Sequence, residues 1–173
     1  MLALLHELQG IDFVRQLRRI TERREFSPLE TDSQIYVVGN ETSEDYQALL
    51  NAARKAVEHG NKVFVLPNPK GIRTADFIFA RRGVLKLFDL KTITGKNSVG
   101  NRLAESLGQT DRVLLNIQTN YNIRRLTQEI RRHFEVSASV QEVLIYNGGK
   151  EISVKRNIAM SKGFLKMMLN SFR

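Results

Sequence analysis

The chain has 173 residues, 42% of them hydrophobic, which is enough for one ordinary globular domain with a sizeable core. It contains no cysteine, which excludes disulfide bonds, thiolate zinc sites and cysteine nucleophiles. No apolar run reaches the roughly 20 residues that span a bilayer, and the first residues lack the basic start of a signal peptide, so we expect a cytoplasmic protein without a membrane partner. Lys and Arg number 27 against 18 Asp and Glu, and a net charge of +9 favours a polyanionic partner, most often nucleic acid.

The first third of the chain predicts alternating helices and strands. Apolar residues recur at helical spacing with a break at Gly10, and Pro28 marks the end of this basic segment. Side chains that cap helix starts precede the next apolar periodicity. The predicted elements are a helix up to about residue 26, a strand at 35–38, a helix from a cap at Thr42 or Ser43 to residues 59–60, and a buried strand at 62–66.

The rest of the chain continues this alternation after a hairpin over residues 74–92. A polar loop at 94–98 leads to a helix, with Asn97 or Ser98 as its cap. The further elements are that helix up to residues 107–108, a strand at 112–117, a helix from Ile123 to Phe134, a strand at 143–146, a turn at Gly148 and Gly149, an edge strand at 151–155, and a short amphipathic helix after Ile158.

This pattern predicts an α/β protein with a mixed sheet. The chain shows no internal repeat, low-complexity stretch or linker, which favours a single domain overall. We expect residues 1–30 to form a basic helical extension that packs on the core. Residues 31–173 are then the main domain.

The hairpin over residues 74–92 is the most informative part of the sequence. Two apolar strands flank a tight basic turn at residues 81–83, Asp76 lies in the first strand, and Asp89 and Lys91 close the second. Since side chains alternate along a strand, Asp89 and Lys91 share a face, and the hairpin register can bring Asp76 beside them. Charges at the ends of core strands are costly to bury without partners.

A divalent metal would reconcile these charges with an apolar setting. The carboxylates of Asp76 and Asp89 suit Mg²⁺ or Mn²⁺, and the backbone carbonyl of Leu90 can add a third oxygen. Lys91 would then orient or help to deprotonate a metal-activated water and offset phosphate charge. The alternative is that both acids are ordinary strand-end residues and that Lys91 simply pairs with Asp89.

With this spacing the chain resembles the PD-(D/E)xK nuclease superfamily. Asp76 matches the first motif acid, with Ala75 where the family has proline, and Asp89 and Lys91 match the second half. The resemblance implies a restriction-endonuclease-like core, in which a helix precedes a three-stranded antiparallel meander, a second helix and a further strand. It also implies metal-dependent phosphodiester hydrolysis.

Members of this superfamily often have two further site residues. One is an acid on the first core helix, for which Glu44, Asp45 and Glu58 are available and Glu44 is our candidate. The other is a polar residue on the helix after the motif, and the resemblance assigns this role to Gln109.

A closer resemblance is to the C-terminal nuclease domains of contact-dependent growth inhibition toxins, several of which cleave transfer RNA. It covers residues 61–117 and extends less closely to residue 146, with Asp instead of Glu before the lysine. As further partners it suggests an immunity-type protein, and a second copy of this chain is also considered. The matching stretches are Ala75-Asp76-Phe77, Asp89-Leu90-Lys91-Thr92, Lys96-Asn97-Ser98, Gln109 and Asp111-Arg112-Val113-Leu114-Leu115.

The leading hypothesis is therefore a metal-dependent endonuclease that hydrolyses RNA or DNA. One alternative is a catalytically inactive nucleic-acid-binding protein with a nuclease-like fold, and another is an interaction protein whose N-terminal helix docks a partner. Exposed arginines would bind phosphates in the first two cases and form a solvated face in the third. The candidates are Arg81, Arg82, Arg124, Arg125, Arg131 and Arg132.

Overall fold

The computed structural model describes residues 5, 8–39, 44–68, 74–95 and 99–173. Contacts within the chain group it into two compact units, Met1–Leu90 and Lys91–Arg173. We call them the N-terminal unit and the C-terminal unit and describe each by itself. The strand β5, Val84–Ile93, runs from the first into the second.

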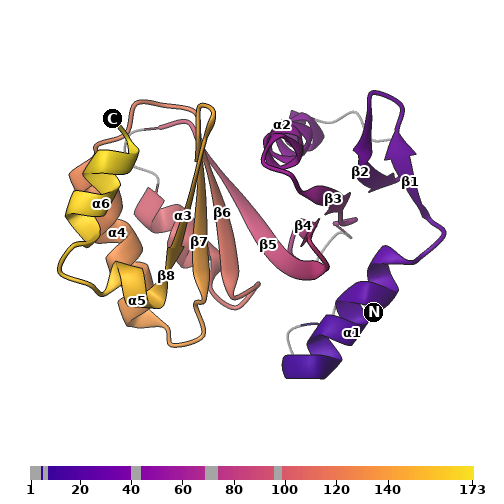
Figure 1. Ribbon diagram of the computed structural model, residues 1–173, viewed down its shortest axis with the longest axis horizontal. Coiled ribbons are helices and arrows are strands. Elements are labelled where there is room, and N and C mark those ends of the chain that lie inside the picture. The colour runs from indigo at the N-terminus through magenta and orange to yellow at the C-terminus, as the bar shows by residue number, and fades with distance from the viewer. Residues whose placement is uncertain (1–4, 6–7, 40–43, 69–73, 96–98) are drawn as a thin grey trace. The chain divides into compact units, whose positions relative to one another are not determined.

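The described residues of the N-terminal unit form two helices and five strands (Figure 1). Apart from β5, its elements are α1 Gly10–Thr21, β1 Phe26–Leu29, β2 Asp32–Val38, α2 Glu44–Glu58, β3 Lys62–Val65 and β4 Phe77–Arg81. Strand β2 pairs antiparallel with β1 and parallel with β3. Strands β3, β4 and β5 form an antiparallel meander.

A two-residue turn closes the hairpin between β4 and β5. Arg81 pairs with Val84, and the two residues between them, Arg82 and Gly83, have positive φ angles of 49° and 78°. Positive φ at both central positions is the signature of a type I′ turn, whose twist matches that of the flanking strands. The tight basic turn expected from the sequence is confirmed.

Helix α1 is part of the packed interior of the N-terminal unit. Its buried residues Leu17 and Ile20 join a cluster with Ile78 of β4 and Leu87 of β5. Because side chains alternate along a strand, the buried rings of Phe77, Phe79 and Phe88 occupy the other face of these strands, where neighbouring rings stack at 5.0–5.5 Å between centroids. In Figure 1, α1 and α2 lie on opposite sides of β3 and β4.

The C-terminal unit has three strands of its own and four helices (Figure 1). Its elements are α3 Val99–Ser106, β6 Arg112–Ile117, α4 Ile123–Val136, β7 Glu142–Asn147, β8 Lys150–Lys155, α5 Arg156–Ala159 and α6 Phe164–Ser171. Strand β7 pairs parallel with β6 and antiparallel with β8. The helices cover one face of this sheet, and the strand side chains on that face are buried.

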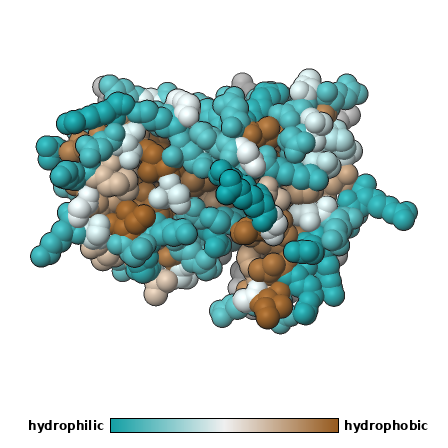
Figure 2. All heavy atoms as spheres, in the orientation of Figure 1, coloured by the Kyte–Doolittle hydropathy of each residue, from teal (hydrophilic) through white to brown (hydrophobic). Residues whose placement is uncertain are grey.

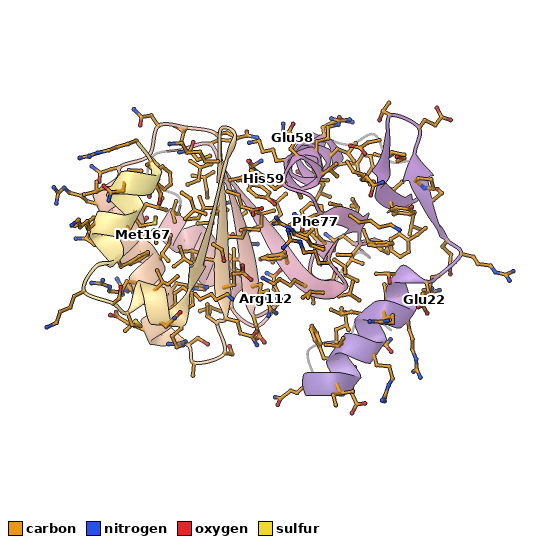
Figure 3. The ribbon with its side chains drawn as sticks, viewed as in Figure 1. Glu22, Glu58, His59, Phe77, Arg112 and Met167 are labelled. Atoms are coloured by element: carbon orange, nitrogen blue, oxygen red, sulfur yellow. The ribbon has the colours of Figure 1, made fainter. Side chains whose placement is uncertain are left out.

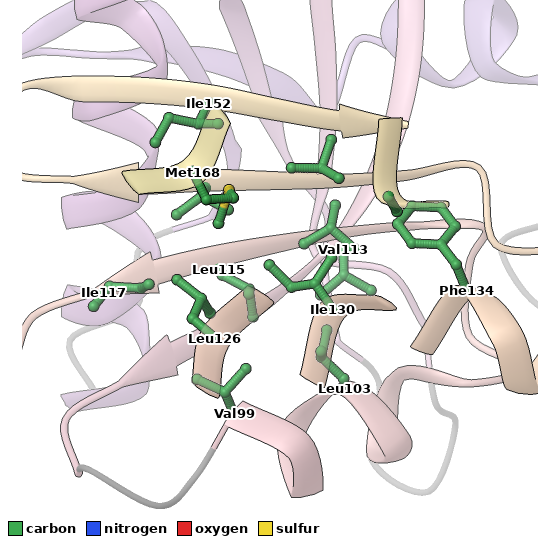
Figure 4. Close-up of a cluster of buried hydrophobic side chains, with 14 of the residues drawn as sticks. Val99, Leu103, Val113, Leu115, Ile117, Leu126, Ile130, Phe134, Ile152 and Met168 are labelled. Carbon is green, nitrogen blue, oxygen red and sulfur yellow. The ribbon is translucent and has the colours of Figure 1, made fainter. Parts of the chain in front are cut away.

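The core of the C-terminal unit lies between that sheet face and the helices (Figure 4). Register explains its composition, since Val113 of β6 lies opposite Val143 of β7, which lies opposite Val154 of β8. Leu126, Ile130 and Phe134 recur at helical spacing along α4 and line the helical side of the core.

The mixed α/β fold class predicted from the sequence is confirmed. The described residues contain parallel and antiparallel strand pairs with helices between them, and α2, the β3–β4–β5 meander, α3 and β6 follow one another in the expected order. The division into residues 1–30 and 31–173 stays a prediction. Among the described residues, no helix is long and apolar enough to cross a membrane.

One predicted element is wrong. The helix expected up to about residue 26 ends at Thr21, and Phe26–Leu29 forms β1. Pairing with β2, in which Phe26 lies opposite Val38, outweighs the local helical preference, and Pro28 is tolerated because β1 is an edge strand. The predicted caps at Thr42, Ser43, Asn97 and Ser98 lie outside the described residues.

Arg156 closes the C-terminal end of α4, where carbonyl groups lack helical partners. Its Nη1 donates to the carbonyl of Phe134 at 2.7 Å, and its Nη2 donates to the carbonyl of Ser137 at 2.5 Å. The guanidinium also lies 5.5 Å from the centroid of the Phe134 ring. This single side chain therefore ties the strand-to-helix junction at the end of β8 to α4.

We expect Arg156→Ala to lower the free energy of unfolding by about 2 kcal/mol, because charge-assisted hydrogen bonds to half-buried carbonyls are lost. Urea titration followed by circular dichroism measures the change. The exposed Arg132→Ala on α4 is the matched control and should change stability little. Equal stability of the two variants would contradict this role for Arg156.

His133 is a buried ionisable side chain in the C-terminal unit. It lies on α4 with 4% of its surface exposed, and its Nε2 atom has no hydrogen-bond partner among the described residues. Burial lowers the pKa of His133 to about 4. In the unfolded chain the same imidazole has its ordinary pKa near 6.5.

Acid should therefore destabilise the fold through His133. The penalty is small at pH 7 and above, where the imidazole is mostly neutral in both states, and it grows as the pH falls toward 4, because the unfolded chain binds the proton more readily. Between pH 7 and 4.5 we expect the wild-type chain to lose about 2 kcal/mol more stability than His133→Leu. Urea titrations at both pH values measure this, and parallel losses would exclude His133 as the cause.

Candidate active site at the end of the β4–β5 hairpin

Asp76 is held at the point where β4 begins, between the two neighbouring strands. Its backbone N–H donates to the carbonyl of Phe88 on β5 at 2.9 Å. Its own carbonyl accepts from the N–H of Leu66, just after β3, at 2.8 Å. Backbone hydrogen bonds to both neighbouring strands therefore hold Asp76 in the meander, independently of any bond that its side chain makes.

The carboxylate of Asp76 reaches across to β5. Its Oδ2 accepts a hydrogen bond from the backbone N–H of Leu90 at 2.7 Å. The last residue pair of the β4–β5 register is Phe77 opposite Phe88. The Asp76 side chain therefore reaches the residues of β5 that follow Phe88. The carboxylate of Asp76 consequently lies at the backbone between Asp89 and Lys91, as the hairpin register predicted.

Asp89 is one of the few charged side chains buried within the described ranges, with 2% of its surface exposed. Strand alternation places it on the same face as Leu85 and Leu87, which is the face that packs against α1. A carboxylate at this depth needs compensation by hydrogen bonds, cations or a metal. The site therefore lies at the edge of an apolar cluster, which excludes bulk water from one side of it.

Lys91 follows Asp89 on the same strand, β5, and is partly buried. The two residues are separated by one position, so they share a face of the strand. Thr74, two residues before Asp76, has a buried hydroxyl oxygen without a hydrogen-bond partner among the residues that the structure describes. A polar atom in this state commonly marks a position for water or a ligand.

The oxygen atoms available at this end of the meander are of the kind that binds a hard divalent cation. Asp76, Asp89 and the carbonyl of Leu90 are oxygen ligands, and Mg²⁺ typically takes one or two carboxylates and keeps several waters. The described residues contain no group of three or more His, Cys, Asp or Glu that could hold a metal ion. Glu44 begins α2, but its side chain lies outside what the structure describes.

Gln109 has a clear local role in the C-terminal unit. Its Nε2 donates to the carbonyl of Glu105 at 2.8 Å, and its backbone N–H donates to the carbonyl of Ser106 at 3.1 Å. Both bonds satisfy carbonyls at the end of α3. Its predicted role in catalysis stays a prediction.

The arginines predicted to bind phosphate differ in how they are used. Arg81, Arg82, Arg124 and Arg132 are exposed. Arg125 forms an ion pair with Glu129 at 3.1 Å. In contrast, Arg131 donates to the carbonyls of Ala159 and Ser161 at 2.9 Å, which joins α4 to the segment before α6.

Two exposed lysines were not predicted from the sequence. Lys162 lies in the turn two residues before α6, and Lys166 lies on this helix. A signal for them was present, since residues 156–173 contain four Lys and Arg and no Asp or Glu. The segment was predicted as a short amphipathic helix from its apolar residues, and no role was assigned to its polar side.

Comparison with known proteins supports part of the expected resemblance. Residues 73–152, a little under half of the chain, match the sequence model of the contact-dependent growth inhibition CdiA C-terminal domain. This range includes Asp76, Asp89, Lys91 and Gln109. The central part of the chain is thus similar to toxin C-terminal domains of this family.

Other comparisons add little. The CdiA-CT/CdiI toxin and immunity complex from Burkholderia pseudomallei contains a chain that is 14% identical, with 68% of this chain and 92% of that chain covered and a TM-score of 0.45. This structural similarity is too low to carry an argument. None of the curated proteins matches.

The bond between Asp76 and Leu90 predicts how substitutions will behave. Asp76→Asn retains an oxygen that can accept from the Leu90 N–H, whereas Asp76→Ala leaves this N–H without its acceptor. We expect Asp76→Ala to lower stability by about 1–2 kcal/mol and to speed exchange of the Leu90 amide proton. Thermal unfolding and hydrogen exchange measure both, and equal exchange in the two variants would show that the bond contributes nothing.

Proposed function

We propose that this protein is a metal-dependent endonuclease that hydrolyses phosphodiester bonds in nucleic acid. The observation that carries the proposal is the hydrogen bond from Leu90 to the Asp76 carboxylate, which brings a second acid to β5 beside the buried Asp89. The family match over residues 73–152, which include both acids, supports it. The basic composition fits a polyanionic substrate.

The residues of this site have separate tasks in the proposed reaction. Asp76 and Asp89, with the carbonyl of Leu90, would hold Mg²⁺ or Mn²⁺. When bound, such an ion supplies Lewis-acid stabilisation of phosphate charge and a water of lowered pKa. The Leu90 N–H keeps Asp76 in its orientation, and the apolar cluster beside Asp89 limits access of bulk water.

Lys91 is the candidate for the remaining chemistry. Its ammonium group can orient the attacking water through a hydrogen bond and offset the negative charge that develops on the phosphate. It follows Asp89 by two residues on β5, so its direction is set by the backbone of this strand. Glu44 and Gln109 stay secondary candidates, for a further acid and a polar contact.

The test is cleavage of labelled RNA and DNA substrates by the purified chain with Mg²⁺ or Mn²⁺. We expect cutting to stop when a chelator removes the metal, and Asp89→Asn and Lys91→Ala each to reduce the cleavage rate by about a hundredfold or more. Both variants should still bind nucleic acid, as measured by fluorescence anisotropy. A substrate panel of transfer RNA, other RNAs and DNA would identify the class that is cut.

Asp12→Asn is the matched control for this experiment. Asp12 is an exposed carboxylate on α1 that pairs with Arg15 at 2.9 Å, so the same chemical change there should leave cleavage unaffected. Undiminished cleavage by both Asp89→Asn and Lys91→Ala would refute the mechanism. Cleavage that persists in chelator would point instead to a metal-independent reaction through the RNA 2′-hydroxyl.

A second candidate function is nucleic-acid binding without turnover. It is favoured by the lack of a third acidic or histidine ligand beside Asp76 and Asp89 among the described residues, and by the engagement of Gln109 at the end of α3. Salt-sensitive binding without cleavage under any metal would support it. An immunity-type protein, a second copy of the chain and a cytoplasmic site of action stay predictions.

A further inference from the structure

The positive charge of the chain is concentrated in one of its two units. Residues 91–173 contain 14 Lys and Arg against 6 Asp and Glu, a net charge of +8. Residues 1–90 contain 13 against 12, a net charge of +1. Both candidate carboxylates, Asp76 and Asp89, therefore belong to the nearly neutral unit, whereas the excess of positive charge belongs to the other.

Many cations of the C-terminal unit are used within the fold. Arg102 pairs with Glu105, and Arg112 with Glu142. As described above, the guanidinium of Arg125 is paired with Glu129, and those of Arg131 and Arg156 bind main-chain carbonyls. These groups are poorly placed to bind a partner. The exposed cations whose side chains have no ion pair or hydrogen bond among the described residues are Arg124, Arg132, Lys155, Lys162, Lys166 and Arg173.

Exposed polar and basic residues lie on α6 and directly before and after it. Lys166 and Asn170, four residues apart, share one exposed side of the helix, Lys162 lies in the turn two residues before its first residue, and Arg173 lies two residues after its last. We call these four residues the α6 stripe. The opposite side of the helix carries Phe164 and Met168, which are fully buried, so the core fixes which side of α6 faces solvent.

The surface at the stripe has a shallow, open depression. It has a volume of about 490 Å³ and is lined by Gly163, Lys166, Met167, Asn170 and Ser171. Figure 3 labels Met167 on α6 and so locates this part of the surface. With no acid between residues 156 and 173, nothing nearby in the sequence offsets the charge of the two lysines.

The chemistry of the stripe favours nucleic acid over a membrane or a protein. A helix that binds a membrane surface inserts an apolar face, but the apolar face of α6 is buried in its own core. Protein interfaces concentrate aromatic and other apolar anchors, and the stripe has none. Lysine ammonium groups, an amide and a guanidinium are the donors that bind phosphate oxygens.

We propose that the α6 stripe binds the phosphate backbone of the nucleic acid on which the protein acts. Binding then resides in the C-terminal unit, whereas Asp76 and Asp89 belong to the N-terminal unit. The proposal rests on the proposed function only in identifying the bound polymer as the one that is cut. Lys162 and Lys166 are its central residues.

The test measures binding apart from cleavage. Asp89→Asn protein in the presence of a chelator is titrated into a labelled RNA stem–loop and a labelled DNA duplex over a series of salt concentrations. With Lys162→Gln and Lys166→Gln added, we expect affinity to fall by about tenfold at moderate salt, and the slope of log K against log salt to become smaller by about 1.5. Lys162→Arg with Lys166→Arg should retain most of the binding.

The control removes the same charge from the other unit. Arg19 and Arg24 are exposed in the N-terminal unit, and Arg19→Gln with Arg24→Gln should change affinity by no more than about twofold. If this pair weakens binding as much as the lysine pair, or if neither nucleic acid binds, the proposal is wrong. It is also wrong if the lysine pair loses affinity for phosphatidylserine vesicles but not for nucleic acid.

Cleavage assays on the same lysine variants, with Asp89 restored, separate this proposal from the proposed function. If the wild-type chain cuts nucleic acid and the lysine variant binds and cuts equally well, the stripe proposal fails and the nuclease remains. If the lysine variant loses binding while the wild-type chain cuts nothing, the stripe stands and the nuclease fails. Unchanged thermal unfolding shows that the lysine variants are folded.

Discussion

The candidate site depends on one hydrogen bond, from the Leu90 N–H to the Asp76 carboxylate. It joins the start of β4 to β5 at the point where the regular register of the hairpin ends. Backbone bonds to Phe88 and Leu66 hold the same residue in place from both sides. Two acids that are 13 positions apart in sequence are thereby brought to one end of the meander, and any chemistry proposed there relies on this arrangement.

The apolar packing around the hairpin explains why charges can be kept at this position. Leu87 and Ile78 join Leu17 and Ile20 of α1 in one cluster, and Asp89 lies on the same face of β5. A buried carboxylate has to be compensated by hydrogen bonds, a cation or a metal. The same burial strengthens any interaction with a cation, because the local dielectric is low. In a metal-dependent site a bound cation compensates the charge of Asp89, whereas at an inert strand end hydrogen bonds and neighbouring side chains do so.

The excess positive charge and the candidate carboxylates belong to different units of the chain. The surface of the protein is largely hydrophilic in the view of Figure 2, but the excess of positive charge belongs to residues 91–173. Within that unit, arginines such as Arg131 and Arg156 are part of the framework, because a planar guanidinium can satisfy two carbonyls at once. Lysines hold a mobile point charge in water, and Lys162 before α6 and Lys166 on it remain exposed. Counting basic residues in the sequence cannot separate these two uses.

Local sequence patterns determined the fold class, most elements and the pairing of Asp76 with β5, because strand alternation and turn preference depend on neighbouring residues. The tight turn at Arg82 and Gly83 and the helical spacing of Leu126, Ile130 and Phe134 are of this kind. Tertiary structure alone decided that Phe26–Leu29 is a strand, since its partner β2 supplies the hydrogen bonds. Gln109 closes α3 through bonds to residues three and four positions earlier, which is a local arrangement. Tertiary structure likewise decided that Lys166 faces solvent, because the core on the other side of α6 sets the orientation of this helix.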